Sequence, residues 1–225
     1  MKPDLESFEK LNVAITQCER CPRLREHCLK IATVKKRAFK NDTYWGRPVP
    51  PLWLGIQKPK TPTWPKLIII GLAPSAHGAN RTGRMFTGDA SGLWLYRALN
   101  EFNLYNTAYI TTFVKCAPPD NKPNLTETTN CRDYFGQELS TMLPLARAVL
   151  CFGHEAYKQF LFVAKSHLAL PDPKLPFKHG HEINASHKKI FLSYHPSQQN
   201  TATKKLTKPM FDSVFSNIQS YLEGV

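Results

Sequence analysis

Residues 71–89 read GLAPSAHGANRTGRMFTGD, and this stretch decides how the rest of the chain is interpreted. It follows an isoleucine-rich run at 66–70, which is typical of a strand buried on both faces of a parallel sheet. The stretch holds four glycines, which let a backbone approach a ligand closely, and one carboxylate, Asp89. Helical spacing of apolar residues at 93–102 predicts a helix after it. A long polar loop at the carboxyl end of a parallel strand indicates a ligand site rather than an ordinary connection.

Strands and helices alternate through the remainder of the chain. Further strands are predicted at 108–114, 147–152 and 189–194, and further helices at 4–17, 126–143, 155–163 and 208–222. This alternation predicts an α/β fold, with a four-stranded parallel sheet covered on both sides by helices in a single domain. Proline-rich segments at 57–65 and 166–183 are predicted to be loops. Because parallel strands end at one edge of a sheet, the loops at 71–89, 116–123 and 195–200 should converge on one cleft.

The charge balance favours a polyanionic partner. The 225 residues include 30 lysines and arginines against 17 acidic residues, a net charge of +13. Nucleic acid is the first candidate and an acidic membrane surface the second, although a basic protein with neither partner stays open. Residues 35–55 interleave basic and aromatic side chains, as on phosphate-binding surfaces, but could equally be a linker held by Trp45 and Trp53. No apolar run approaches the length of a membrane span, so we expect no membrane partner and a cytoplasmic location.

The six cysteines argue for metal ligation rather than disulfides in such a compartment. Four of them form a C-x2-C pair and a C-x14-C pair: Cys18, Cys21, Cys116 and Cys131. Four thiolates suit an iron–sulfur cluster or a structural zinc, and the spacing does not separate the two. Four buried free cysteines are the alternative. Cys28 is a possible substitute ligand, and Cys151 lies inside a predicted strand.

These motifs together resemble the uracil-DNA glycosylase superfamily, and more narrowly its family 5 (type B) enzymes. The resemblance rests on the 71–89 motif, the C-x2-C segment, VKCAPPDNKP at 114–123 and HPS at 195–197, and it spans residues 18 to about 200. It implies a three-layer α/β/α domain that excises uracil from double-stranded, and in some contexts single-stranded, DNA as a monomer. It also implies a structural 4Fe–4S cluster held by Cys18, Cys21, Cys116 and Cys131.

Excision requires the nucleotide to leave the base stack and enter a pocket. The resemblance gives Phe86 the role of stacking on the base, although it could instead anchor the loop. His195 is the expected hydrogen-bond donor to the uracil oxygen as negative charge develops, unless it only pins the strand end. His77 and the backbone around Leu72 and Ala73 are further candidates for base binding.

The residue that activates water is less sharply indicated. Better known families carry a carboxylate or polar side chain where this chain has Leu72 and Ala73. Asp89 is therefore the candidate to orient water or to stabilise the sugar cation, with capping of the following helix as its rival role. Asn80, as a further base-binding residue, and Asn121, as a further catalytic residue, are candidates for contacts to water or backbone. Leaving-group stabilisation without a strong base is the alternative.

Base choice and DNA contact complete the expectations. Thr112 stands where a related family has an asparagine that reads uracil, so we expect looser selectivity that includes hypoxanthine and xanthine. Ser197 and Gln198 are expected in the DNA groove, and Arg81 and Arg84 at phosphates. A non-catalytic iron–sulfur protein that binds nucleic acid is the alternative function. A phosphate-binding nucleotide enzyme ranks lower, because no G-x-x-x-x-G-K-[ST] or G-x-G-x-x-G motif is present.

Overall fold

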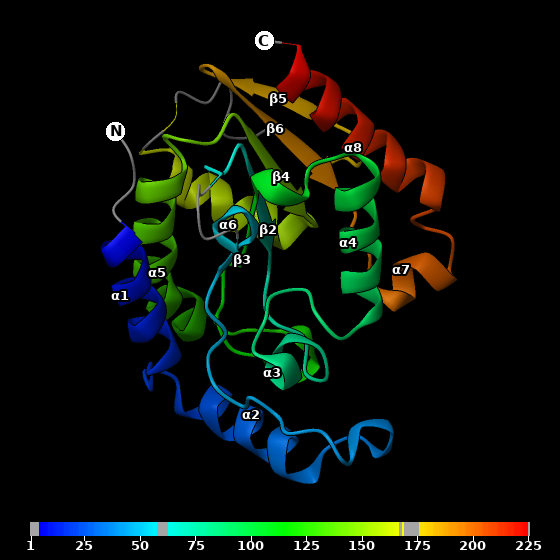
Figure 1. The fold of residues 1–225 in the computed structure, drawn as a ribbon. Helices are drawn as coiled ribbons and strands as arrows, with labels where there is room; N and C mark the ends of the chain where they lie inside the picture. Colours follow the sequence, from blue (N-terminus) through cyan, green and yellow to red (C-terminus); the bar gives the residue numbers. More distant parts are fainter. Residues whose placement is uncertain (1–4, 58–62, 167, 169–175, 225) are drawn as a thin grey trace.

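A six-stranded sheet forms the centre of the molecule in the computed structural model, which describes residues 5–57, 63–166, 168 and 176–224 (Figure 1). Its strand order is β1-β3-β2-β4-β6-β5. In chain order the strands are β1 (Leu52–Trp53), β2 (Leu67–Gly71), β3 (Ala108–Thr112), β4 (Ala148–Phe152), β5 (Glu182–Ala185) and β6 (Lys188–Ser193).

The four central strands, β3, β2, β4 and β6, are parallel, as the alternation of strands and helices predicts. Two antiparallel edge strands that the sequence did not predict, β1 and β5, extend this four-stranded parallel core. The first is only two residues long in a proline-rich segment, and the second pairs back on β6 through a tight turn at Ser186, whose φ is 55°. Neither gives a strand-like pattern long enough to stand out in sequence. Of the loops predicted at 57–65 and 166–183, residues 58–62, 167 and 169–175 lie outside the described part.

Helices cover both faces of the sheet, which gives the expected three layers (Figure 1). Along the chain they are α1 (Leu5–Thr16), α2 (Pro22–Val34), α3 (Ala79–Thr82), α4 (Ala90–Glu101), α5 (Leu125–Met142), α6 (His154–Ala164), α7 (Gln198–Ala202) and α8 (Lys208–Glu223). Short 3-10 turns are η1 (Arg37–Phe39), η2 (Leu54–Gln57), η3 (Tyr105–Thr107) and η4 (Pro119–Asn121). The sequence pattern did not predict α2, α3 or α7.

The two apolar cores follow from the alternation of side chains along the strands. In β2, Ile68 and Ile70 pack with α1, α5 and α6, whereas Leu67 and Ile69 pack with α4 and α8. All of these strand residues are fully buried, as expected for a central parallel strand. In the described part of the chain, no helix is both long enough and apolar enough to cross a membrane.

Candidate active site

A cavity of about 770 Å³ lies at the carboxyl edge of the sheet, where the loops after the four parallel strands meet. The predicted convergence is therefore present. Residues from all three of the expected loops line it: Leu72, Ala73, Ser75, Phe86, Asp89, Asn121, His195, Ser197 and Gln198. The volume falls in the usual range for small-molecule sites.

Phe86 is held in an unusual backbone conformation, with φ of 52° in the left-handed region. A bulky residue rarely adopts this conformation, so the surrounding structure must enforce it. Two glycines make room for it: a Cβ on Gly71 would lie 2.9 Å from the Phe86 ring, and a Cβ on Gly92 would overlap the Phe86 carbonyl. The ring is 8% exposed and lines the cavity. The glycines of the 71–89 motif and of the helix after it thus place an aromatic face at the pocket wall.

His195 stands beside that ring at the end of β6. The two ring centroids are 5.9 Å apart with a 30° angle between the planes, and Phe152 contacts both rings. Burial lowers the pKa of His195 from 6.5 to about 4, although the charge of Asp89 acts in the opposite direction. The imidazole is therefore neutral near pH 7 and can donate one hydrogen bond into the cavity.

Asp89 performs the capping role and also lines the cavity. Its Oδ1 accepts a hydrogen bond from Gly92 N at 2.9 Å and so caps α4. Its Oδ2 accepts a hydrogen bond from Ser75 Oγ. A Cβ on Gly78 would overlap both partners of this second bond, so the missing side chain there leaves the space that the pair occupies. The carboxylate is consequently fixed in orientation at both oxygens while it faces the pocket.

Asn121 and Thr112 reach the cavity from the strand β3 side. Asn121 and its neighbour Asp120 both have positive φ, 55° and 52°, in a turn that brings the amide to the lining. Thr112 also lines the cavity, but its hydroxyl donates to Val114 O at 2.7 Å. That hydroxyl is therefore occupied within its own turn rather than presented as a fixed reader of a base edge.

Three side chains of the motif do not face the cavity, and the predictions that His77 and Asn80 line a base pocket are wrong. The His77 ring meets Tyr44 Oη at 3.0 Å, and the fully buried Asn80 amide donates to Cys28 O at 3.4 Å. Arg81 donates to His77 O and Gly88 O and forms an ion pair with Asp42. These contacts face α2 and the segment after it, so Arg81 is not free for phosphate either. Arg84 is exposed.

The sequence reasoning missed the contribution of β4. Phe152, Gly153, His154 and Glu155 all line the cavity, because β4 ends at the same edge as the other parallel strands. The topological rule that linked the other three loops would have included this one. The sequence reasoning also missed Ser75, which lies inside the quoted motif. Its only signal in sequence is its place three residues before Gly78, the N-cap of α3, and that signal is weak by itself.

The cysteines predicted as ligands gather at the junction of the N-terminal helices with β3 and α5. All six cysteines are free of disulfides. The Tyr134 hydroxyl, which donates to Ala14 O at 3.3 Å, lies beside Cys18, and Cys131 lies beside Cys18 and Cys21. The Cys28 thiol of α2 donates to Ala117 O at 3.6 Å, the carbonyl of the residue after Cys116.

No group of three or more histidine, cysteine or acidic side chains in the described residues is close enough to hold a single metal ion. A 4Fe–4S cluster takes one thiolate per iron, so its ligands stand further apart than those of one ion. The free thiols from the α1–α2 connection, the segment after β3 and α5 are donors of the kind that such a cluster takes.

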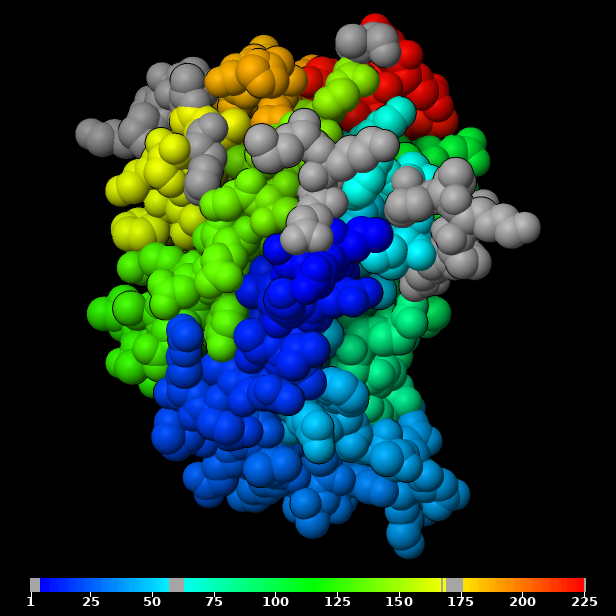
Figure 2. All heavy atoms as spheres, turned by 60° about the vertical axis from the view of Figure 1, so that its left-hand side comes forward, coloured from blue at the N-terminus to red at the C-terminus, as the bar shows by residue number. Residues whose placement is uncertain are grey.

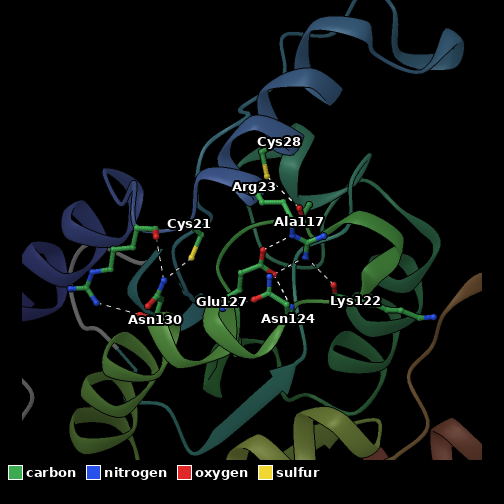
Figure 3. A network of polar contacts seen from close by, with 9 residues as sticks. Cys21, Arg23, Cys28, Ala117, Lys122, Asn124, Glu127 and Asn130 are labelled. Carbon is green, nitrogen blue, oxygen red and sulfur yellow. Dashed lines mark hydrogen bonds and ion pairs between the residues drawn. The ribbon is translucent and has the colours of Figure 1, made fainter.

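Polar contacts around these cysteines tie α2 to α5 (Figure 3). Arg23 binds Glu127 through two bonds of 2.7 and 2.8 Å and also donates to Lys122 O. Glu127 and Asn124 form a capping box at the start of α5. Asn130 donates to Cys21 Sγ at 3.4 Å. The bidentate pair lowers the pKa of Glu127 against the effect of its burial, so the carboxylate stays ionised.

Comparison with known proteins agrees with this geometry. A family model described as the uracil DNA glycosylase superfamily matches residues 59–219, which include every pocket-lining residue, and this is the class that the fold and pocket define. The chain is 41% identical over 225 residues to a type-5 uracil-DNA glycosylase of Mycobacterium bovis, covering 93% of this chain and 80% of that protein. It is 39% identical over 208 residues to the type-5 enzyme of Pyrobaculum aerophilum, covering 86% and 84%.

A type-4 uracil-DNA glycosylase of the same archaeon is 30% identical over 193 residues, covering 84% of this chain and 83% of that protein. The type-5 relatives are thus more similar than this type-4 protein over a comparable length. The chain belongs to the type-5 family of uracil-DNA glycosylases.

Proposed function

We propose that this chain is a DNA repair glycosylase that draws uracil out of the duplex and hydrolyses its N-glycosidic bond, leaving an abasic site. One observation carries the proposal: the Phe86 ring and the neutral His195 imidazole share one wall of a cavity large enough for a nucleobase. The named activity of the type-5 relatives supports it. No feature of the pocket favours the non-catalytic alternative.

The chemistry can be assigned to side chains at the pocket. As the bond between the sugar and the base breaks, its electron pair moves to the base and positive charge develops on the sugar. The His195 N–H would donate to the base oxygen that takes up the negative charge. Asp89, fixed by Ser75 and Gly92, would stabilise the sugar cation and orient the water whose oxygen adds to the sugar carbon. The water proton that is released balances the charge on the departing base.

We infer that hypoxanthine and xanthine are substrates beside uracil. The volume of the cavity exceeds what a pyrimidine base requires. The Thr112 hydroxyl donates to Val114 O and therefore does not select one base edge. Leu72 and Ala73 line the cavity with apolar side chains, which cannot form hydrogen bonds that distinguish one base from another. Duplex DNA is the expected substrate form, single-stranded DNA a second one, and a monomer is sufficient because the pocket is built within one chain.

We also propose that Cys18, Cys21, Cys116 and Cys131 hold a 4Fe–4S cluster that is structural. Bound there, the cluster would join the α1–α2 connection to β3 and α5, beside the turn that carries Asn121 to the pocket. Cys28, which lies beside Cys116 and donates to Ala117 O, is the substitute candidate. Six cysteines without disulfides fit a reducing cytoplasm.

Excision assays test these proposals directly. The purified protein is incubated with duplexes that carry a single uracil, hypoxanthine or xanthine, and abasic sites are detected by strand cleavage in alkali. Uracil release supports the glycosylase, and release of all three supports the broad selectivity. No release from any duplex by protein with a full iron content would overturn the function, whereas release of uracil alone would overturn only the selectivity. Visible absorbance with iron and sulfide analysis tests the cluster, and a protein free of iron after anaerobic preparation contradicts it.

A further inference from the structure

The last turn of α2 and the segment that follows it are rich in cations that have no carboxylate partner in the described structure. Residues 30–47, here named the basic arm, contain six lysines and arginines and one acidic residue, Asp42. Asp42 is already paired with Arg81 from the 71–89 motif. Among the described carboxylates, none pairs with a basic residue of the arm. Most of these cations are exposed: Lys30, Lys36, Arg37, Lys40 and Arg47.

The basic arm projects from the end of the molecule at which α3 lies (Figure 1). In the space-filling view its light blue residues form the lower tip of the molecule (Figure 2). The cavity lies beside α3, because Ala79 at the start of this helix is one of its lining residues. A duplex that presents a nucleotide to the cavity would therefore pass close to the arm.

The motif that lines the pocket also holds the arm in place. His77 meets Tyr44 Oη, the Arg81 guanidinium lies 3.8 Å from the centre of the Phe39 ring, and the main chain of residues 45 and 46 donates to the carbonyls of Arg81 and Asn80 at 2.9 and 3.0 Å. A Cβ on Gly83 would lie 2.9 Å from the Trp45 ring, so this glycine admits the indole. One face of the 71–89 loop thus lines the pocket while the other binds the arm.

The electrostatic effect of the arm reaches this loop. Burial first, and then the charges of Lys36 and Arg81, lower the pKa of His77. A positive field on this face of the 71–89 loop attracts a polyanion, and DNA carries about one negative charge per 1.7 Å of helix axis. The aromatic Trp45, 37% exposed with Arg47 6.0 Å above its ring, adds a surface typical of nucleic-acid contacts.

We propose that the basic arm binds the phosphate backbone of duplex DNA on one side of the extruded nucleotide, and that His77, Asn80 and Arg81 position the arm for this contact. The inference rests on the proposed function, since DNA is the occupant it requires. It assigns the phosphate contacts predicted for Arg81 to cations that Arg81 helps to place.

Salt dependence of binding distinguishes such contacts from a structural role. The test variant is K36A/R37A/K40A, which keeps every anchoring residue. The matched control is K10A/K66A/K165A, which removes three exposed cations from α1, the amino end of β2 and the far end of α6. Affinity is measured by fluorescence anisotropy on a duplex with an abasic site, which cannot be cleaved further by excision, at a series of salt concentrations.

In the arm variant, the slope of log affinity against log salt should become less negative by about 0.9 for each lost phosphate contact, up to about 2.7 in all. The control should leave the slope within about 0.5 of wild type. The maximal single-turnover rate should stay unchanged, because none of the three cations touches the cavity. Equal slopes for the arm variant and the wild type would overturn the proposal.

Duplex length provides a second, independent measurement. The affinity difference between wild type and the arm variant should vanish when the duplex is cut short on one side of the lesion and persist when it is cut on the other. A difference that persists on both truncated duplexes would show a diffuse charge effect and overturn a located contact. The proposed function fails separately, through absence of excision by the wild-type protein, whatever the anisotropy shows.

Discussion

His195 lines the pocket with a pKa lowered by burial to about 4, and its role as a hydrogen-bond donor depends on a neutral imidazole. We predict that H195A lowers the single-turnover excision rate on a uracil duplex by about 100- to 1000-fold, the usual effect of losing one donor to a developing oxyanion. Affinity for an abasic-site duplex should stay within about threefold, because binding rests mainly on phosphate contacts. An excision rate that falls less than about tenfold would assign leaving-group stabilisation elsewhere.

The low pKa of His195 also predicts how stability depends on pH. Between pH 6.5 and about 4 the unfolded chain binds a proton at this position while the folded chain does not, so the free energy of unfolding falls as the pH falls through this window. Above pH 6.5 the contribution is constant. Urea unfolding of wild type and H195Q should diverge across the window by up to about 3 kcal/mol, with the smaller pH dependence in the variant. Parallel curves would contradict the shift.

Asp89 allows its charge to be separated from its capping role, because asparagine caps helices as well as aspartate does. D89N should keep the bond to Gly92 N and unfold within about 1 kcal/mol of wild type, while excision falls by about 10²- to 10⁴-fold. D89A should lose both activity and about 1 kcal/mol of stability. If D89N excises uracil at the wild-type rate, the carboxylate acts only as a cap.

At the scale of single elements, the end of β3 is held by a buried charge. The Lys115 ammonium donates to Thr111 Oγ1 at 2.8 Å and to Thr112 O at 2.6 Å, and it forms an ion pair with Glu138 of α5 at 2.5 Å. Both charged side chains are almost completely buried. The pair therefore links the segment after the strand that ends in Thr112 to the helix that carries Cys131.

Breaking this pair should cost more than replacing it. We predict that K115M lowers the free energy of unfolding by about 3–5 kcal/mol, because Glu138 is left charged in the core. K115M/E138M should recover a large part of the loss, since both charges are then gone. Urea unfolding of wild type and the two variants measures this. A double variant that is less stable than K115M would show that Glu138 does not depend on Lys115.

The same elements show how far sequence reasoning could go. The parallel strands and the edge where their loops converge followed from apolar runs and topology, whereas the roles expected of Phe86 and His195 rested on the family resemblance. The directions of His77, Asn80 and Arg81 did not, because a loop has no fixed period that sets which side chains point inward. Their partners, Tyr44 and Asp42, lie in a segment whose path is set by tertiary contacts. The direction of the Thr112 hydroxyl could not be predicted either, because it donates to a main-chain carbonyl, Val114 O, whose position depends on the path of the turn.

At the scale of the whole molecule, the N-terminal helices are joined to the sheet layer by the Arg23–Glu127 pair and by the region of the four candidate ligand cysteines. A cluster bound there would stabilise the folded state, because metal affinity adds to folding free energy when the site exists only in the folded chain. We therefore predict that C131S loses iron and unfolds at a lower temperature than wild type. The shift should be about 2–4 °C for each kcal/mol of lost stability.

Two other cysteines supply the controls for this experiment. C151A alters a fully buried thiol of β4 and should keep a full iron content even if it loses some stability to the cavity. C28A should keep iron as well, unless Cys28 rather than Cys116 is the ligand, in which case C116A keeps it instead.

Because α2 leads directly into the basic arm, iron loss in C131S should also weaken DNA binding more than H195A does. Full iron in C131S, or equal melting temperatures with and without iron, would mean that protein contacts alone hold the N-terminal helices to the sheet.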